Sequence, residues 1–169
     1  MGKIATLAGD RILISARQDL QCSRGKIVEH GGTPVHAATF IRRRRIVLDR
    51  DLLHNNGELR RILLHEVFHF VWVRLPNTRR RSFEELLAAE RTTPGELGWS
   101  AEYRKLALGA PDVRRRSRKW REYCCEAFCD TAAYLYARSG KHAEFTLPLR
   151  FRQKRIAWFE ENLVGRIPI

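Results

Sequence analysis

The pattern of apolar and polar residues divides the chain into two halves. In the first half, short runs rich in β-branched residues predict strands at residues 11–15, 26–29, 35–40 and 45–48. A turn signal, Gly-Gly-Thr-Pro, separates the second run from the third. The last two runs are predicted to pair as a hairpin with arginines at its bend.

The second half shows the longer spacing that is typical of helices. Residues 58–75 are apolar on nearly every face in their middle and end before Pro76, which indicates a central, buried helix. Further helices are predicted at residues 82–90, with Ser82 as N-cap, and at 113–138 and 150–163. Strands first and helices after predict an α+β fold. In it, a small antiparallel or mixed N-terminal sheet packs on the central helix and on a second long helix.

Length and composition fit one folded domain, which we expect to span residues 1–169. The chain is 44% hydrophobic, unlike a disordered chain, and has no apolar run long enough to cross a bilayer. Its N-terminus lacks the apolar segment of a secretory signal. Three of the 4 cysteines cluster in one predicted helix, where the adjacent Cys124 and Cys125 are poor disulfide partners. These features predict a cytoplasmic protein with reduced thiols.

The charge balance is strongly basic, with 32 Lys and Arg residues against 19 Asp and Glu residues and a net charge of +13. Arginine runs occupy residues 42–45, 79–81 and 114–116. Such a surface attracts nucleic acid, acidic proteins or anionic membrane, but it is also found as an ordinary solvated face. We expect weak, sequence-independent binding to nucleic acid or acidic partners at most.

The most informative motif is His-Glu-Val-Phe-His at residues 65–69. His65 and His69 are four residues apart, so on a helix they lie on one face and can bind one Zn²⁺ ion. Glu66 is predicted to be the general base that takes a proton from zinc-activated water. A pair of core histidines is the ordinary alternative. Here, however, the polar residues interrupt an apolar segment, and burying them is costly unless a metal satisfies them.

A peptidase zinc site needs a third protein ligand and one open position. In metzincins, a glycine lies three residues after the second histidine of the motif, and a third histidine ligand lies six residues after it. Here Leu75 and Trp72 occupy those two positions, which excludes that class. The better candidate for the third ligand is Glu126. Asp130 lies one turn later on the same helical face, where it can accept a hydrogen bond from a ligand histidine.

Two other ligand sets remain open. Glu122 lies one turn before Glu126 and is an alternative third ligand, with Glu126 then supporting it. Cys125 and Cys129 are also four residues apart, and with the two histidines they would form a closed Cys2His2 structural site.

A peptidase also stabilises the oxyanion of its tetrahedral intermediate. Tyr123, one turn before Glu126, is the preferred catalytic residue for this role, and Tyr134 and His142 are the other candidates. A packed tyrosine with a solvated hydroxyl is the ordinary explanation of Tyr123.

The His-Glu-x-x-His motif, followed by Glu-x-x-x-Asp at residues 126–130, resembles the gluzincin metallopeptidases, and among them the minimal ImmA/IrrE-like proteins. The resemblance covers residues 35–138. It implies zinc bound by the two histidines and Glu126, with Glu66 as base and Asp130 as a supporting residue. It also implies that an edge strand within residues 35–40 holds an extended peptide by strand addition.

The chemistry of these residues favours a zinc-dependent metallopeptidase that hydrolyses peptide bonds in a protein or peptide. The alternative is a basic, nucleic-acid-associated protein with a structural or regulatory zinc site. No helix-turn-helix, zinc-finger or aromatic-platform motif in the sequence supports that alternative. A third possibility is an interaction domain that has lost its catalytic activity.

Overall fold

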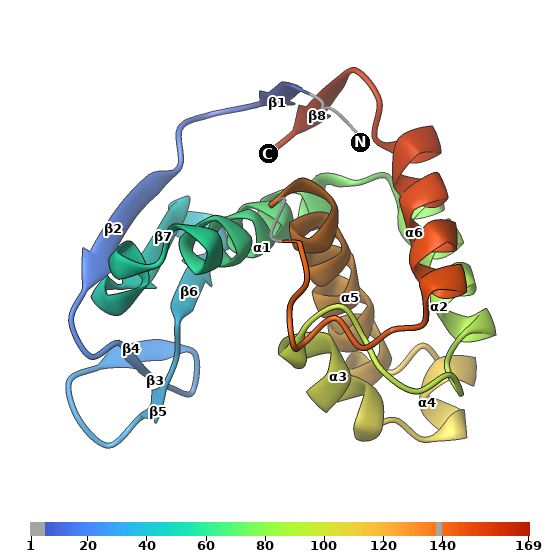
Figure 1. The fold of residues 1–169 in the computed structure, drawn as a ribbon, viewed down its shortest axis with the longest axis horizontal. Coiled ribbons are helices and arrows are strands. Elements are labelled where there is room, and N and C mark those ends of the chain that lie inside the picture. Colours follow the sequence, from blue (N-terminus) through green and yellow to red (C-terminus); the bar gives the residue numbers. More distant parts are fainter. Residues whose placement is uncertain (1–5, 138–139) are drawn as a thin grey trace.

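Most of the described strands lie in the N-terminal part of the chain and the α-helices follow, with one short strand after the last helix, which gives an α+β fold (Figure 1). The computed structural model describes residues 6–137 and 140–169. Its strands are β1 Thr6–Ala8, β2 Leu13–Arg17, β3 Gln21–Ser23, β4 Lys26–Val28, β5 Thr33–Pro34, β6 Ala37–Phe40, β7 Arg45–Asp49 and β8 Arg166–Pro168. Its α-helices are α1 Asn56–Arg74, α2 Asn77–Ala89, α3 Trp99–Leu106, α4 Ala110–Arg114, α5 Arg118–Tyr136 and α6 Leu149–Asn162.

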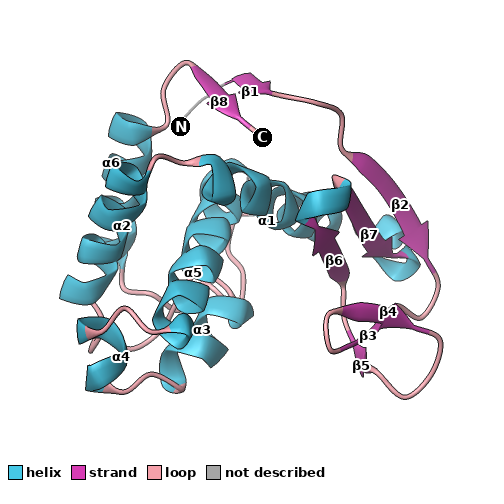
Figure 2. Cartoon of the chain, turned by 180° about the vertical axis from the view of Figure 1, so that it is seen from behind, coloured by secondary structure: helices cyan, strands magenta, loops and turns pink. Residues whose placement is uncertain are grey.

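The strands form three small sheets. The central sheet has the order β2-β7-β6, in which β2 runs parallel and β6 antiparallel to β7. The predicted hairpin is therefore confirmed, with arginines in the turn Ile41–Arg43 and Arg44 in the left-handed region at φ 46°. Strands β3, β4 and β5 form a second antiparallel sheet, and β1 pairs with β8 near the two ends of the chain (Figure 2).

Helices α1 and α5 cross at the centre of the molecule and hold its main core (Figure 1). Asn55 begins α1, because its side chain accepts hydrogen bonds from the backbone N–H groups of Gly57 and Glu58 at 3.2 Å. Phe68 of α1 is fully buried and packs against Phe128 of α5, with ring centroids 6.0 Å apart and the rings tilted by 47°. The predicted central helix and second long helix are thus both present, and their shared core fixes their relative position.

Two predicted helix boundaries are wrong. Helix α2 begins at Asn77, directly after Pro76, so Ser82 lies inside the helix and is not its N-cap. The Ser82 hydroxyl instead accepts a hydrogen bond from the indole of Trp158 at 2.7 Å, which ties α2 to α6.

The predicted helix over residues 113–138 is two helices. A break separates α4 from α5, where Arg116 has a φ of 47° and Ser117 caps α5 by accepting from the Trp120 N–H. Residues 138–139, at the predicted C-terminal end, lie outside the described residues. Helix α3 was not predicted at all. None of the helices in the described part of the chain is long and apolar enough to cross a membrane.

Candidate metal centre

One turn of α1 presents the polar residues of the His-Glu-x-x-His motif. His65, Glu66 and His69 each offer a potential ligand atom, and these atoms lie within 4.8 Å of one another. The rings of the two histidines meet edge to face, with centroids 4.9 Å apart. His65 is buried and His69 is half-buried, because α5 packs over this turn.

Helix α5 brings Glu126 against both imidazoles. Its Oε2 atom lies 3.2 Å from Nε2 of His65 and 3.9 Å from Nε2 of His69. Ligand atoms bound to zinc at 2.0–2.1 Å in a tetrahedral site stand about 3.3 Å apart. The two separations lie close to this value, so Glu126 is placed to share a cation with either imidazole. The clusters of ligand atoms that all lie within 4.8 Å of one another are His65, Glu66 and His69, and His69, Cys125 and Cys129, and neither contains Glu126.

Asp130 supports His65 from behind. Its Oδ1 atom lies 2.7 Å from Nδ1 of His65, and since an ionised carboxylate can only accept, this nitrogen carries the proton. The other carboxylate oxygen accepts from the backbone N–H of Ala101 at 3.1 Å. Gly98 is needed here, because a Cβ at this position would collide with the Asp130 carboxylate. Asp130 therefore joins the candidate ligand to the start of α3.

His69 has a sulfur as its supporting partner. Nδ1 of His69 lies 3.3 Å from Sγ of Cys125. Cys129 is one turn further along α5, and its sulfur lies within 4.8 Å of the potential ligand atoms of both other residues. The predicted Cys2His2 set is not assembled, since this second cluster contains only one of the two histidines.

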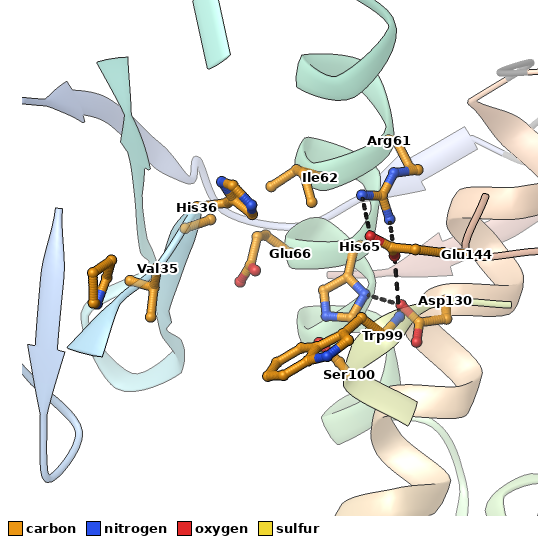
Figure 3. Close-up of a pocket in the computed structure, with 12 residues that line it drawn as sticks. Val35, His36, Arg61, Ile62, His65, Glu66, Trp99, Ser100, Asp130 and Glu144 are labelled. Carbon is orange, nitrogen blue, oxygen red and sulfur yellow. Dashed lines mark hydrogen bonds and ion pairs between the residues drawn. The ribbon is translucent and has the colours of Figure 1, made fainter. Parts of the chain in front are cut away.

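The remaining motif residue, Glu66, faces a cleft between α1 and the strands. The hydroxyl of Thr39 in β6 donates to Oε2 of Glu66 at 2.5 Å, which fixes the carboxylate. The cleft has a volume of about 370 Å³. Figure 3 shows His65 and Glu66 on one side of it, Val35 and His36 on the opposite side, and Trp99 below His65.

A charged network lies at one end of the cleft (Figure 3). Arg61 donates to Glu58 at 2.8 Å and to Glu144 at 3.0 Å, and Glu144 also accepts from the backbone N–H of Trp99 at 3.0 Å. Trp99 itself is 65% exposed and stacks on the equally exposed Tyr103. These residues were missed from the sequence, because the contact between α1 and the segment near Glu144 spans more than 80 positions.

Electrostatics favour an ionised carboxylate beside the histidines. Burial raises the pKa of Glu126, but the hydrogen bond from His65 and the positive charges of His69 and Arg104 outweigh it and lower the pKa to about 2. Burial lowers the pKa of His65, whereas the charge and hydrogen bond of Asp130 raise it, and the net pKa is well above the usual value. Without a cation, these carboxylates therefore favour a protonated histidine.

Glu122 and Tyr123 do not reach this cluster. Glu122 pairs with Arg104 at 3.1 Å and with Arg118 at 2.7 Å, so its carboxylate is directed to other partners. Tyr123 is fully buried and donates to Glu96 at 2.6 Å, inside a separate polar cluster. The geometry therefore gives no support to Tyr123 as an oxyanion-stabilising residue.

The other two oxyanion candidates also have partners of their own. Tyr134 packs against Phe145, with ring centroids 5.0 Å apart. Nε2 of His142 lies 2.9 Å from Oε1 of Glu58, next to the charged network at the end of the cleft. Of the two, only His142 lies close to the cleft, because its partner Glu58 accepts a hydrogen bond from Arg61, which lines the cleft.

Comparison with known proteins adds no family to these observations: no family model, curated protein or solved structure matches the chain. The resemblance to gluzincins therefore stays a prediction.

Proposed function

We propose that this protein is a zinc-dependent metallopeptidase. The observation that carries the proposal is the position of Glu126 Oε2 beside Nε2 of His65 and Nε2 of His69, with Glu66 on the same turn and facing a cleft. Two nitrogens and one carboxylate oxygen are the donor set of catalytic zinc sites that keep a fourth position open. A bound zinc ion supplies Lewis acidity, which lowers the pKa of water and polarises a carbonyl group.

The protein's own residues then supply proton transfer. Glu66 follows His65 by one residue, so its side chain is directed about 100° around the helix from that of His65. The carboxylate is held by the Thr39 hydroxyl. In the proposed reaction it takes a proton from the attacking water and delivers a proton to the leaving amine.

The cleft is suited to an extended peptide. Strand β6 is an edge strand of its sheet, and residues 35–37, which lead into it, line the cleft opposite α1. A peptide that adds to this edge would be held by backbone hydrogen bonds and would pass the carboxylate of Glu66. Trp99 also lines the cleft, and it stacks on Tyr103, so the cleft offers an exposed aromatic side chain to a bound peptide.

Substitution of Glu66 by Gln tests the proposal. Loss of the carboxylate removes the base, so cleavage of a peptide library should fall by at least about 100-fold, within the range that general base catalysis contributes. Zinc content, measured by elemental analysis, should stay at about one ion per chain, since Glu66 is not proposed as a ligand. Native protein without zinc, or an active Glu66→Gln variant, would contradict the proposal.

A second candidate function is binding of a polyanion such as nucleic acid. A separate groove of about 950 Å³ is lined by five basic residues, Arg17, Lys26, Arg42, Arg43 and Arg45, and no acidic side chain is among its described lining residues. Binding through these charges should weaken steeply as salt is raised, because phosphate contacts release counterions. Fluorescence anisotropy with a labelled oligonucleotide measures this, and absence of binding at low salt would assign the groove to ordinary solvated surface.

A further inference from the structure

The two histidines of α1 are supported in different ways by residues of α5. Nδ1 of His65 meets the carboxylate of Asp130 at 2.7 Å, whereas Nδ1 of His69 meets the sulfur of Cys125 at 3.3 Å. The ligand candidate Glu126 lies next to Cys125 on the same helix. Helix α5 therefore brings both a ligand candidate and the two supporting partners.

The contact with the Cys125 sulfur bears on which nitrogen of His69 can bind a metal. A neutral imidazole carries its proton on one nitrogen and a lone pair on the other, and only the lone pair can bind a metal. Nδ1 of His69 faces Cys125, and Nε2 faces Glu126 at 3.9 Å. A proton held on Nδ1 by an acceptor leaves the lone pair of Nε2 directed to the candidate metal position.

We propose that Cys125 is a positioning residue for metal binding, whose sulfur accepts the Nδ1–H of His69 and holds its ring for coordination through Nε2. The inference rests on the proposed zinc centre and deepens it. Cys129 is fully buried one turn away on α5, and its sulfur lies within 4.8 Å of that of Cys125. The supporting partner is thus a thiol sulfur where the other histidine has a carboxylate.

The rival assignment makes Cys125 and Cys129 direct ligands together with His69. Such a site needs a fourth ligand to be closed. His65 does not provide it, because its Nδ1 is engaged by Asp130 and its Nε2 lies 3.2 Å from Glu126. The geometry thus separates a coordinating face, formed by the two Nε2 atoms and Glu126, from the sulfurs behind His69.

Two substitutions of Cys125 test the proposal, with zinc affinity measured by competition with a chelator on the full chain. Cys125→Ala removes the acceptor and should weaken zinc binding about 10–100-fold, as loss of a supporting hydrogen bond does. Cys125→Ser keeps an acceptor and should recover most of the affinity. Cys124→Ala is the matched control, because Cys124 is the preceding residue of α5, is fully buried and packs in the main core. The zinc affinity of this variant should equal that of the wild-type protein.

Cobalt-substituted protein separates positioning from coordination. If Cys125 only supports His69, the wild-type spectrum should lack thiolate-to-cobalt charge-transfer absorption in the near ultraviolet. A charge-transfer band that disappears in Cys125→Ser would overturn the proposal in favour of a sulfur ligand. A Cys125→Ala variant that binds zinc as tightly as the wild-type protein would also overturn the proposal. So would a Cys125→Ser variant that binds zinc as weakly as Cys125→Ala, provided that its circular dichroism shows a folded chain.

The readout is metal affinity, so the outcome is distinguishable from failure of the proposed function. Absence of peptide cleavage by zinc-loaded wild-type protein would reject the peptidase activity, while the affinity series would still support the role of Cys125. Conversely, active peptidase with no affinity loss in Cys125→Ala would reject this inference alone.

Discussion

Two glutamates on α5, one helical turn apart, have opposite surroundings. Glu126 is largely buried and faces the two imidazoles, whereas Glu122 is about one-third exposed and faces none. Glu122 pairs with Arg118 and with Arg104, and Arg104 also contacts Glu126 at 3.4 Å. Exposed ion pairs of this kind contribute little, typically below about 1 kcal/mol. The direction of each side chain therefore decides which of the two glutamates can be a metal ligand, although the sequence spacing allows both.

Replacement of each glutamate by Gln should separate the two roles. Glu126→Gln removes a proposed ligand charge, so zinc affinity should fall by more than the about 10–100-fold that is typical of supporting residues. Glu122→Gln should leave zinc affinity unchanged and serves as the control on the same helix. Isothermal titration with zinc measures both. Metal loss in Glu122→Gln with retention in Glu126→Gln would shift the third ligand by one turn.

At the scale of elements, the site depends on a helix junction as well as on α1 and α5. Gly98 precedes α3 and lies against the carboxylate of Asp130, which accepts a hydrogen bond from the third residue of that helix, Ala101. Asp130 in turn hydrogen-bonds to His65. The start of α3 is therefore coupled to the candidate metal centre through one carboxylate.

Gly98→Ala should disturb this coupling. The added methyl group collides with the Asp130 carboxylate, which must move and lengthen its bond to His65. Overpacking of this kind costs about 1–3 kcal/mol of stability, and zinc affinity should fall about 10–100-fold. Chemical denaturation and chelator competition measure the two effects.

Gly57→Ala is the control for this substitution, because a Cβ there would make only an ordinary contact at 3.5 Å. It should leave both properties near wild type. Unchanged metal affinity in Gly98→Ala would show that the position of Asp130 does not govern the histidine.

Elements with a strong local pattern were predictable from the sequence, and elements stabilised from far along the chain were not. The apolar stretch of α1 and the arginine hairpin follow from hydrophobic pattern and turn chemistry. Helix α3 has only 8 residues, and its apolar residues Trp99, Tyr103 and Leu106 are exposed, so neither a long periodic pattern nor a core contact marks it in the sequence. Its start is held by Asp130 of α5, 29 residues beyond Ala101.

The same distinction applies within the site. The spacing of His65, Glu66 and His69 is a local helical signal, so it was readable from the sequence. The contacts of Thr39 with Glu66 and of Cys125 with His69 join residues 27 and 56 positions apart. No spacing rule predicts such pairs, because they depend on how β6 and α5 pack on α1.

At the scale of the whole molecule, a buried ionic cluster joins the C-terminal helix to the segment between α2 and α3. Arg155 of α6 is fully buried and contacts Glu90 at 2.5 Å and Glu96 at 2.7 Å. Glu96 also contacts Lys105 at 2.9 Å and accepts from Tyr123 at 2.6 Å. Removing one partner from such a cluster leaves an unpaired buried charge, which is strongly destabilising.

The two glutamates of this cluster have opposite pKa shifts. Burial raises the pKa of Glu96, but the charges of Arg155 and Lys105 and the Tyr123 hydrogen bond outweigh it, so the net pKa is lowered. Burial also raises the pKa of Glu90, and there Arg155 offsets it only in part, so the net pKa is raised. Ionised Glu96 therefore stabilises the folded state, whereas ionisation of Glu90 opposes folding.

The opposite directions of the two pKa shifts predict that Glu96→Gln and Glu90→Gln lower the free energy of unfolding by different amounts. The stabilisation from Glu96 is complete above the pKa of the unfolded chain, about 4.3, and is lost as pH falls through the lower folded value. At pH 7, Glu96→Gln should therefore cost about 3–5 kcal/mol, and the variant should lose less stability on acidification than wild type does. Glu90→Gln should destabilise the protein less at pH 7, because burial disfavours ionised Glu90 and the charge of Arg155 offsets this only in part. Denaturant unfolding at pH 7 and pH 4 measures both variants, and equal costs at pH 7 would show that Arg155 does not distinguish its two carboxylates.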